Sequence, residues 1–179
     1  MSKQIVLSEI RCGNYALKFD KTLIMGVLNV TPDSFSDGNL FIDADKAIEH
    51  AKKMIQEGAD ILDIGGESSR PGSEPVSEVE ELKRVKKVVE KLAKEANVPI
   101  SVDTYKPKVA EECIKSGASM INDITGLTNN NMVKIASKYK VPVVIMHMKG
   151  KPKDMQQNPT YTDVVREIKE FLGNRIAEA

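Results

Sequence analysis

Residues 60–66 read DILDIGG, and this short apolar run decides the fold class. The run is continuous rather than alternating, which is typical of a strand buried on both faces of a parallel sheet. Similar runs recur along the chain and predict four more strands, at 23–30, 99–104, 119–124 and 141–147.

A helical stripe of apolar residues follows each run, with the i, i+3, i+4, i+7 spacing of an amphipathic helix. These stripes predict helices over 43–57, from Ser77 through Leu92, from Pro107 up to Gly117, and over 130–139 and 163–177. Ser77 and Glu80 have the spacing of a capping box at the start of the second helix. Residues 4–20 instead predict a β-hairpin that turns at Gly13-Asn14.

Five consecutive βα units require a parallel sheet with right-handed crossovers, and two closures compete. These are an open, doubly wound sheet and a (β/α)8 TIM barrel. Polar residues gather where each predicted strand ends, which favours the barrel, because all of its strand ends converge on one mouth. They are Asn29, Glu67, Asp103, Asn122-Asp123 and His147.

The chain supplies about five of the eight units that a closed barrel needs. We therefore predict an N-terminal hairpin over residues 1–21 and a partial α/β barrel over 22–179, and we expect the sequence to be truncated.

The composition excludes several classes of protein. Lys plus Arg and Asp plus Glu both number 26 in 179 residues, so the basic excess of a nucleic-acid binder is missing. No apolar run reaches the roughly 20 residues that span a bilayer. Cys12 and Cys113 lie far apart, which argues against a disulfide scaffold or a structural zinc site. We expect a cytoplasmic protein that binds neither nucleic acid nor membrane.

The first polar loop, residues 29–38, carries hydroxyls, two carboxylates and Phe35. It fits either a solvated connection or a lid that holds a diphosphate and its Mg²⁺. The Asn29 carbonyl is a hard oxygen ligand of the kind that Mg²⁺ accepts beside water and phosphate oxygens.

The second polar loop, residues 65–72, reads GGESSRPG. Its paired glycines permit close approach of a ligand to the backbone. The hydroxyls of Ser68 and Ser69 and the guanidinium of Arg70 suit a phosphate or a carboxylate. The alternative is a turn with an exposed arginine.

Two later strand ends suit a nitrogen heterocycle. The Asp103 carboxylate can accept hydrogen bonds from ring and amino N–H groups, or oppose a developing positive charge. The amide of Asn122 both donates and accepts, which suits the edge of such a ring. Alternation along the strand lets only one of Asn122 and Asp123 face the mouth, and the other is expected to be a cap or a loop brace. Met146 is expected to be pocket wall, and His147 a hydrogen-bonded structural residue.

Assembled, these segments resemble the dihydropteroate synthase family of folate biosynthesis. The similar motifs are MGVLNVTPDSFSDG at 25–38, DIGGESSRPG at 63–72, SVDT at 101–104, INDI at 121–124 and MHM at 146–148. The resemblance implies a (β/α)8 barrel with an N-terminal hairpin. It also implies a transferase that joins 6-hydroxymethyl-7,8-dihydropterin diphosphate to 4-aminobenzoate and releases diphosphate.

The resemblance also implies roles for individual residues. Asn29 would serve the Mg²⁺–diphosphate, and Asp103 would be the catalytic residue that offsets charge on the pterin. Ser69 would lie near the diphosphate and the 4-aminobenzoate, and Asn122 would join Asp103 on the pterin ring. Phe35 and Pro71 would form the wall of the 4-aminobenzoate pocket. From the residues themselves, we also expect Arg70 and Met146 to contact substrate. The complete protein is expected to be a homodimer.

Members of the family also use an Asp, a Lys and an Arg-x-His pair from later strands, which would lie beyond Ala179. We therefore expect residues 1–179 alone to be nearly inactive. Two alternatives stay open. One is a pterin-binding methyltransferase of the methyltetrahydrofolate–corrinoid type, and the other is a non-catalytic half-barrel.

Overall fold

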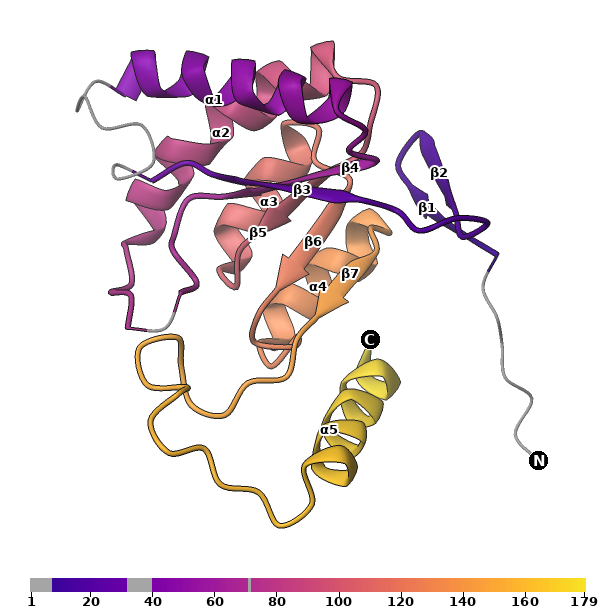
Figure 1. The fold of residues 1–179 in the computed structure, drawn as a ribbon, viewed down its shortest axis with the longest axis vertical. Coiled ribbons are helices and arrows are strands. Elements are labelled where there is room, and N and C mark those ends of the chain that lie inside the picture. The colour runs from indigo at the N-terminus through magenta and orange to yellow at the C-terminus, as the bar shows by residue number, and fades with distance from the viewer. Residues whose placement is uncertain (1–7, 32–39, 71) are drawn as a thin grey trace.

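The computed structural model describes residues 8–31, 40–70 and 72–179. Within them, a two-stranded hairpin precedes a five-stranded parallel sheet (Figure 1). The hairpin pairs β1 (Glu9–Cys12) with β2 (Tyr15–Lys18), and Gly13 takes the positive φ of +59° that its turn requires. The predicted N-terminal hairpin is confirmed; residues 1–7 lie outside the described part.

The sheet strands follow chain order without rearrangement, which excludes the doubly wound alternative. They are β3 (Met25–Asn29), β4 (Ile61–Gly65), β5 (Ile100–Asp103), β6 (Met120–Asp123) and β7 (Val143–Ile145). Each neighbouring pair is parallel, so the predicted βα order is confirmed and the sheet forms part of a barrel wall.

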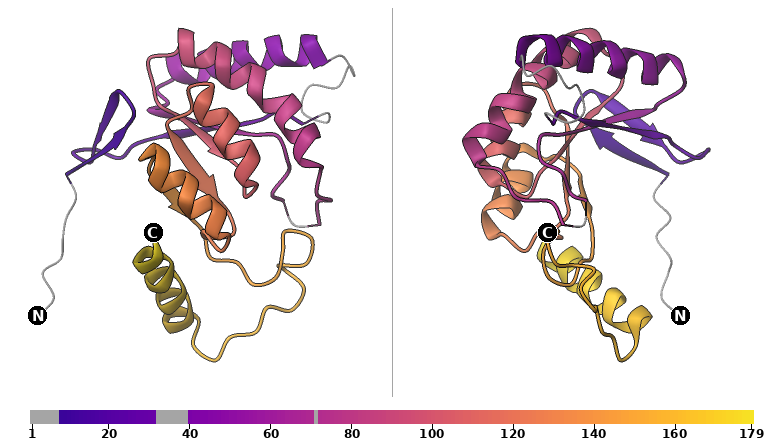
Figure 2. Two further views of the ribbon diagram at one scale, coloured as in Figure 1. Left: turned by 180° about the vertical axis from the view of Figure 1, so that it is seen from behind. Right: turned by 60° about the vertical axis from the view of Figure 1, so that its left-hand side comes forward.

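Four helices cover one face of this sheet (Figure 2). They are α1 (Leu40–Gln56), α2 (Glu78–Glu95), α3 (Pro107–Lys115) and α4 (Asn130–Tyr139). The main core lies between this layer and the strand residues that point toward it, among them Leu62, Ile64 and Val102. A fifth helix, α5 (Val164–Glu178), lies against the β6–α4 connection, where Arg175 Nε donates to the Gly126 carbonyl at 2.9 Å.

Several element boundaries differ from the sequence prediction by a few residues. Helix α1 begins at Leu40, before the predicted 43–57, and β7 is shorter than the predicted 141–147. Lys140 (φ +53°) ends α4 in a left-handed turn. Ser77 Oγ accepts from Glu80 N at 3.2 Å, as the capping box requires. The Glu80 carboxylate, however, pairs with Arg84 at 2.9 Å.

The hairpin packs on the face of the sheet opposite the helices, at the amino ends of the strands. Cys12 and Leu17 from the hairpin join Ile61 and Met120 from the sheet in a second, smaller hydrophobic cluster. Because Ile61 and Met120 begin their strands, the cluster closes the amino ends of the strands and leaves the carboxyl ends for a site. Among the described helices, none combines the length and apolarity that a membrane span requires.

The two outer strands of the sheet predict self-association of this chain when it is made alone. Val27 on β3 and Val144 on β7 are 56% and 40% exposed, and the net charge of zero gives little electrostatic repulsion. We expect residues 1–179 to dimerise or aggregate at micromolar concentration. Light scattering across a dilution series checks this, and a stable monomer throughout would contradict it.

Candidate functional site

Three of the predicted site residues lie in one row across the carboxyl end of the sheet. Asn29 on β3 is in register with Gly65 on β4, Gly65 with Asp103 on β5, and Asp103 with Asn122 on β6. Residues in register on parallel strands point to the same face of a sheet. Asn29, Asp103 and Asn122 therefore face one concavity, as the sequence predicted.

Gly65 leaves a gap in the middle of this row. A Cβ placed there would lie 3.4 Å from Asp103 Oδ2 and 3.6 Å from Asn29 Oδ1. The two oxygens thus flank a space that any other residue at position 65 would begin to fill. The glycine gives a ligand access to both side chains at once.

A second row lies two residues lower on the same face and holds polar groups that are almost fully buried. Asp63 and Ser101 are in register there, 3% and 0% exposed. Asn122 Nδ2 donates to Asp63 Oδ2 at 2.9 Å, which connects the two rows. Within the described chain, Asp63 Oδ1 and Ser101 Oγ have no hydrogen-bond partner. Burial raises the pKa of Asp63.

Asp103 has the most strongly shifted pKa among the residues of the site. Burial raises its pKa to about 7, and the negative charges of Asp63, Glu81, Asp123 and Glu67 act in the same direction. A carboxylate surrounded by other carboxylates is stabilised by any cation that enters the concavity. The site is therefore suited to a ligand that carries or develops positive charge next to Asp103.

The shifted pKa of Asp103 predicts a particular pH dependence of stability. Asp103 binds more protons in the folded chain than in the unfolded chain between the ordinary value of 3.8 and about 7. The contribution of Asp103 to stability therefore falls as the pH rises through this interval. We expect Asp103→Asn to remove this contribution, so that relative to the parent the variant has the higher Tm at about pH 8 but no such advantage at about pH 4. Thermal unfolding followed by circular dichroism checks this; equal slopes in both proteins would contradict it.

The second loop brings Ser69 to the same end of the sheet. Ser69 and Met146 line one cavity of about 250 Å³ together with Tyr161. Arg70 is exposed, and its backbone N–H donates to Ser68 Oγ at 3.4 Å. The predicted positions Phe35 and Pro71 lie outside the described residues, as does Asp37.

Asp123 is a structural residue, as the sequence predicted for one member of the Asn122-Asp123 pair, whereas His147 lines the same cavity as Ser69. Asp123 is fully buried and accepts from the backbone N–H groups of Thr125 and Leu127, at 2.8 and 3.1 Å, so it braces the β6–α4 loop. His147 contacts aromatic rings instead, with ring centroids 5.1 Å from Phe171 and 5.9 Å from Tyr161.

Two acidic side chains have roles that the sequence pattern does not predict. Asp63 lies in the middle of an apolar run, and an acid at such a position signals a buried polar role. Glu67 follows a strand like the predicted site residues, but its carboxylate binds Tyr105 and Lys106 at 2.8 and 2.6 Å. In the described residues, no three His, Cys, Asp or Glu side chains gather as a metal cage.

Comparison with known proteins gives a consistent result. A family profile described as "Pterin binding enzyme" matches residues 25–179. The dihydropteroate synthase of Bacillus subtilis is 59% identical over 129 residues, which are 72% of this chain and 45% of the relative. The chain thus spans about half the length of this relative.

Solved structures agree with the sequence comparison. Xanthomonas albilineans dihydropteroate synthase with 4-aminobenzoic acid is 44% identical, with a TM-score of 0.87 over 95% of this chain and 60% of that chain. The same enzyme in complex with 7,8-dihydropteroate is 40% identical, with a TM-score of 0.82 over 94% and 59%. Because the profile match, the polar row and these relatives agree, we conclude that the chain belongs to the pterin binding enzyme family.

Proposed function

We propose that this chain is the part of a dihydropteroate synthase that binds the pterin substrate. The complete protein would join 6-hydroxymethyl-7,8-dihydropterin diphosphate to 4-aminobenzoate and release diphosphate. The observation that carries this proposal is the single row of Asn29, Asp103 and Asn122 at the carboxyl edge of the sheet. Relatives solved with 4-aminobenzoic acid and with 7,8-dihydropteroate support it.

The row offers complementary groups to a pterin ring. The amide nitrogen of Asn122 is already bound to Asp63, so its carbonyl oxygen is the atom that can accept from a ring or amino N–H. The Asp103 carboxylate can accept from a neighbouring N–H group. Two acceptors in register on adjacent strands, β5 and β6, suit the donor-rich edge of an aminopterin.

The chemistry of the proposed reaction explains the acidity around Asp103. As the bond between the pterin methylene carbon and the diphosphate oxygen breaks, its electrons leave with diphosphate and positive charge develops on the pterin. The ionised Asp103 opposes that charge. The amine of 4-aminobenzoate then forms the new C–N bond and loses a proton, so the enzyme needs no covalent intermediate.

Ser69 and Arg70 would receive the anionic parts of the substrates. A guanidinium and a hydroxyl are good partners for phosphate or carboxylate oxygens. Ser69 lies on the wall of a cavity shared with Met146, which would provide an apolar contact for a ring. The roles of Phe35 and Pro71 as further wall residues stay predictions.

The residues present fit a Mg²⁺ that arrives with the diphosphate. Asn29 Oδ1 faces the space above Gly65, and one neutral oxygen is a suitable protein contribution when phosphates and water supply the remaining ligands. Asn29 would hold the ion, which when bound neutralises charge on the leaving diphosphate.

The test is product formation by the full-length protein. With pterin diphosphate, 4-aminobenzoate and Mg²⁺, we expect dihydropteroate and diphosphate in equal amounts, measured by liquid chromatography and a coupled diphosphate assay. Binding of the pterin without product formation would contradict the proposed reaction.

The family resemblance also supports a homodimeric, cytoplasmic protein as part of this proposal. Size-exclusion chromatography with light scattering on the full-length protein tests the first point. Fractionation of the source cells tests the second.

A further inference from the structure

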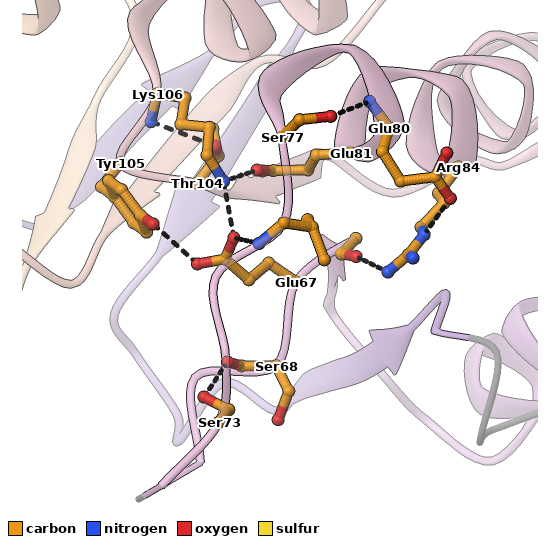
Figure 3. Close-up of polar contacts among 12 residues, drawn as sticks. Glu67, Ser68, Ser73, Ser77, Glu80, Glu81, Arg84, Thr104, Tyr105 and Lys106 are labelled. Atoms are coloured by element: carbon orange, nitrogen blue, oxygen red, sulfur yellow. Dashed lines mark hydrogen bonds and ion pairs between the residues drawn. The ribbon is translucent and has the colours of Figure 1, made fainter. Parts of the chain in front are cut away.

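A buried ionic cluster lies at the base of the second loop (Figure 3). We call it the Lys106 cluster; it contains Glu67, Glu81, Tyr105 and Lys106. Lys106 Nζ binds Glu67 Oε2 at 2.6 Å and also binds Glu81 Oε2, while Tyr105 donates its hydroxyl to Glu67 Oε1 at 2.8 Å. The Glu81 and Glu67 side chains are only 1% and 9% exposed.

Glu67 connects the two ends of the segment 67–76, which contains most of the second loop and the residues that follow it. The backbone N–H of Val76 donates to Glu67 Oε2 at 2.7 Å, so the carboxylate joins the first and last residues of the segment 67–76. Ser73 makes internal bonds within the same segment, from Oγ to the Ser68 carbonyl at 2.5 Å and from N to the Arg70 carbonyl at 3.1 Å. The shape of the loop therefore depends on Glu67.

Lys106 and Tyr105 in turn fix Glu67 to the β5–α3 connection. Burial lowers the pKa of Lys106, but the hydrogen bonds that its ammonium donates to Glu67 and Glu81 outweigh this and leave the pKa raised, so the ammonium stays charged. Lys106 follows Asp103 by three residues in the chain. The second loop is thus anchored to the connection that leaves the strand of Asp103.

We propose that Glu67 is a positioning residue, held by Lys106 and Tyr105, which fixes the second loop so that Ser69 and Arg70 meet the anionic groups of the substrates. This inference rests on the proposed function. Ser69 lies two residues from Glu67 and lines the cavity of about 250 Å³, whereas Glu67 lines a different cavity of about 620 Å³ and has both carboxylate oxygens engaged by Val76, Tyr105 and Lys106. Because these oxygens are bound within the protein, Glu67 would act on binding through the position of the loop.

Two substitutions at position 67 separate loop positioning from simple charge. Glu67→Gln keeps an oxygen for the Val76 N–H and the Lys106 ammonium, and the Tyr105 hydroxyl can rotate to accept from the new amide. Glu67→Ala removes the anchor. In either variant Lys106 retains Glu81 as its counter-ion. Glu74→Ala is the matched control, because Glu74 lies in the same loop but pairs with Lys153 on the surface, where both side chains are more than 60% exposed.

The experiment measures the KM for 4-aminobenzoate in the full-length protein at about pH 8.5, where Asp103 is ionised. We expect Glu67→Ala to raise this KM by about 10- to 100-fold, because a small misplacement of binding groups has effects of this size. Glu67→Gln and Glu74→Ala should stay within about threefold of the parent. Calorimetry with 6-hydroxymethylpterin, which lacks the diphosphate, should give the same affinity in all four proteins.

Three results would overturn the inference: an unchanged KM in Glu67→Ala, an equal loss in Glu67→Gln, or a parallel loss of affinity for the pterin probe. The hold of Glu67 on the loop is also measured independently of turnover, by hydrogen exchange. The Val76 amide should exchange faster in Glu67→Ala and at the parental rate in Glu67→Gln. A parent protein that forms no dihydropteroate would refute the proposed function alone, and this exchange experiment would still decide whether Glu67 holds the loop.

Discussion

Replacing Asp103 by Asn in the full-length protein is expected to lower kcat by about 100- to 1,000-fold, the usual effect of removing one preorganised electrostatic group. The substitution keeps the size and one acceptor oxygen of the side chain but removes its negative charge. That charge opposes the cation that develops on the pterin as diphosphate leaves. The effect should therefore appear in kcat more than in binding of the ground state.

Steady-state kinetics combined with calorimetry separates these two effects. Affinity for 6-hydroxymethylpterin should change little in Asp103→Asn, since the oxygen that accepts from the ring is retained. Asp45→Asn is a suitable control, because Asp45 is an exposed carboxylate on α1 that pairs with Lys91. A variant with near-parental kcat would show that Asp103 serves binding alone.

The polar row was predictable from the sequence because it needs only the order of the strands. Parallel strands in chain order bring their carboxyl ends to one edge, so the residues that end each apolar run must meet there. Asn29 and Asp103 are the last residues of their strands, and Asn122 is the last but one. Their position on one face of the sheet also depends on the register between neighbouring strands. The continuous apolar runs restrict this register but do not determine it.

The Lys106 cluster was not predicted, because its members are distant in sequence and look ordinary one at a time. Lys106 precedes Pro107 at the start of α3, where a cation is unfavourable next to the helix dipole and normally faces solvent. One signal was available in α2. Glu81 lies four residues before Val85 and seven before Val88, on the buried stripe of the helix, so it requires a buried cation.

The second large effect is expected for Lys106→Met, which should destabilise the protein by about 3–5 kcal/mol, the usual cost of leaving a buried charge without its partner. The side chain of Lys106 is 14% exposed and is the cation shared by the Glu67 and Glu81 carboxylates. Methionine fills a similar volume, so the loss arises from charge rather than from a cavity. Denaturant unfolding of the full-length protein measures it.

The double variant Lys106→Met/Glu81→Gln provides the decisive comparison. Neutralising Glu81 removes one of the two uncompensated carboxylates, so the double variant should be more stable than Lys106→Met alone, although it carries one more substitution. Lys108→Met is the matched control, because Lys108 lies in the first turn of α3, close to the N-cap residue Lys106. The Lys108 side chain is 54% exposed and pairs with Glu112 at 3.3 Å, so we expect a change within about 0.5 kcal/mol. If Lys106→Met were as mild as Lys108→Met, or if the second substitution added to the loss, then the buried charges would not be coupled through Lys106, and the anchoring of the second loop would need another explanation.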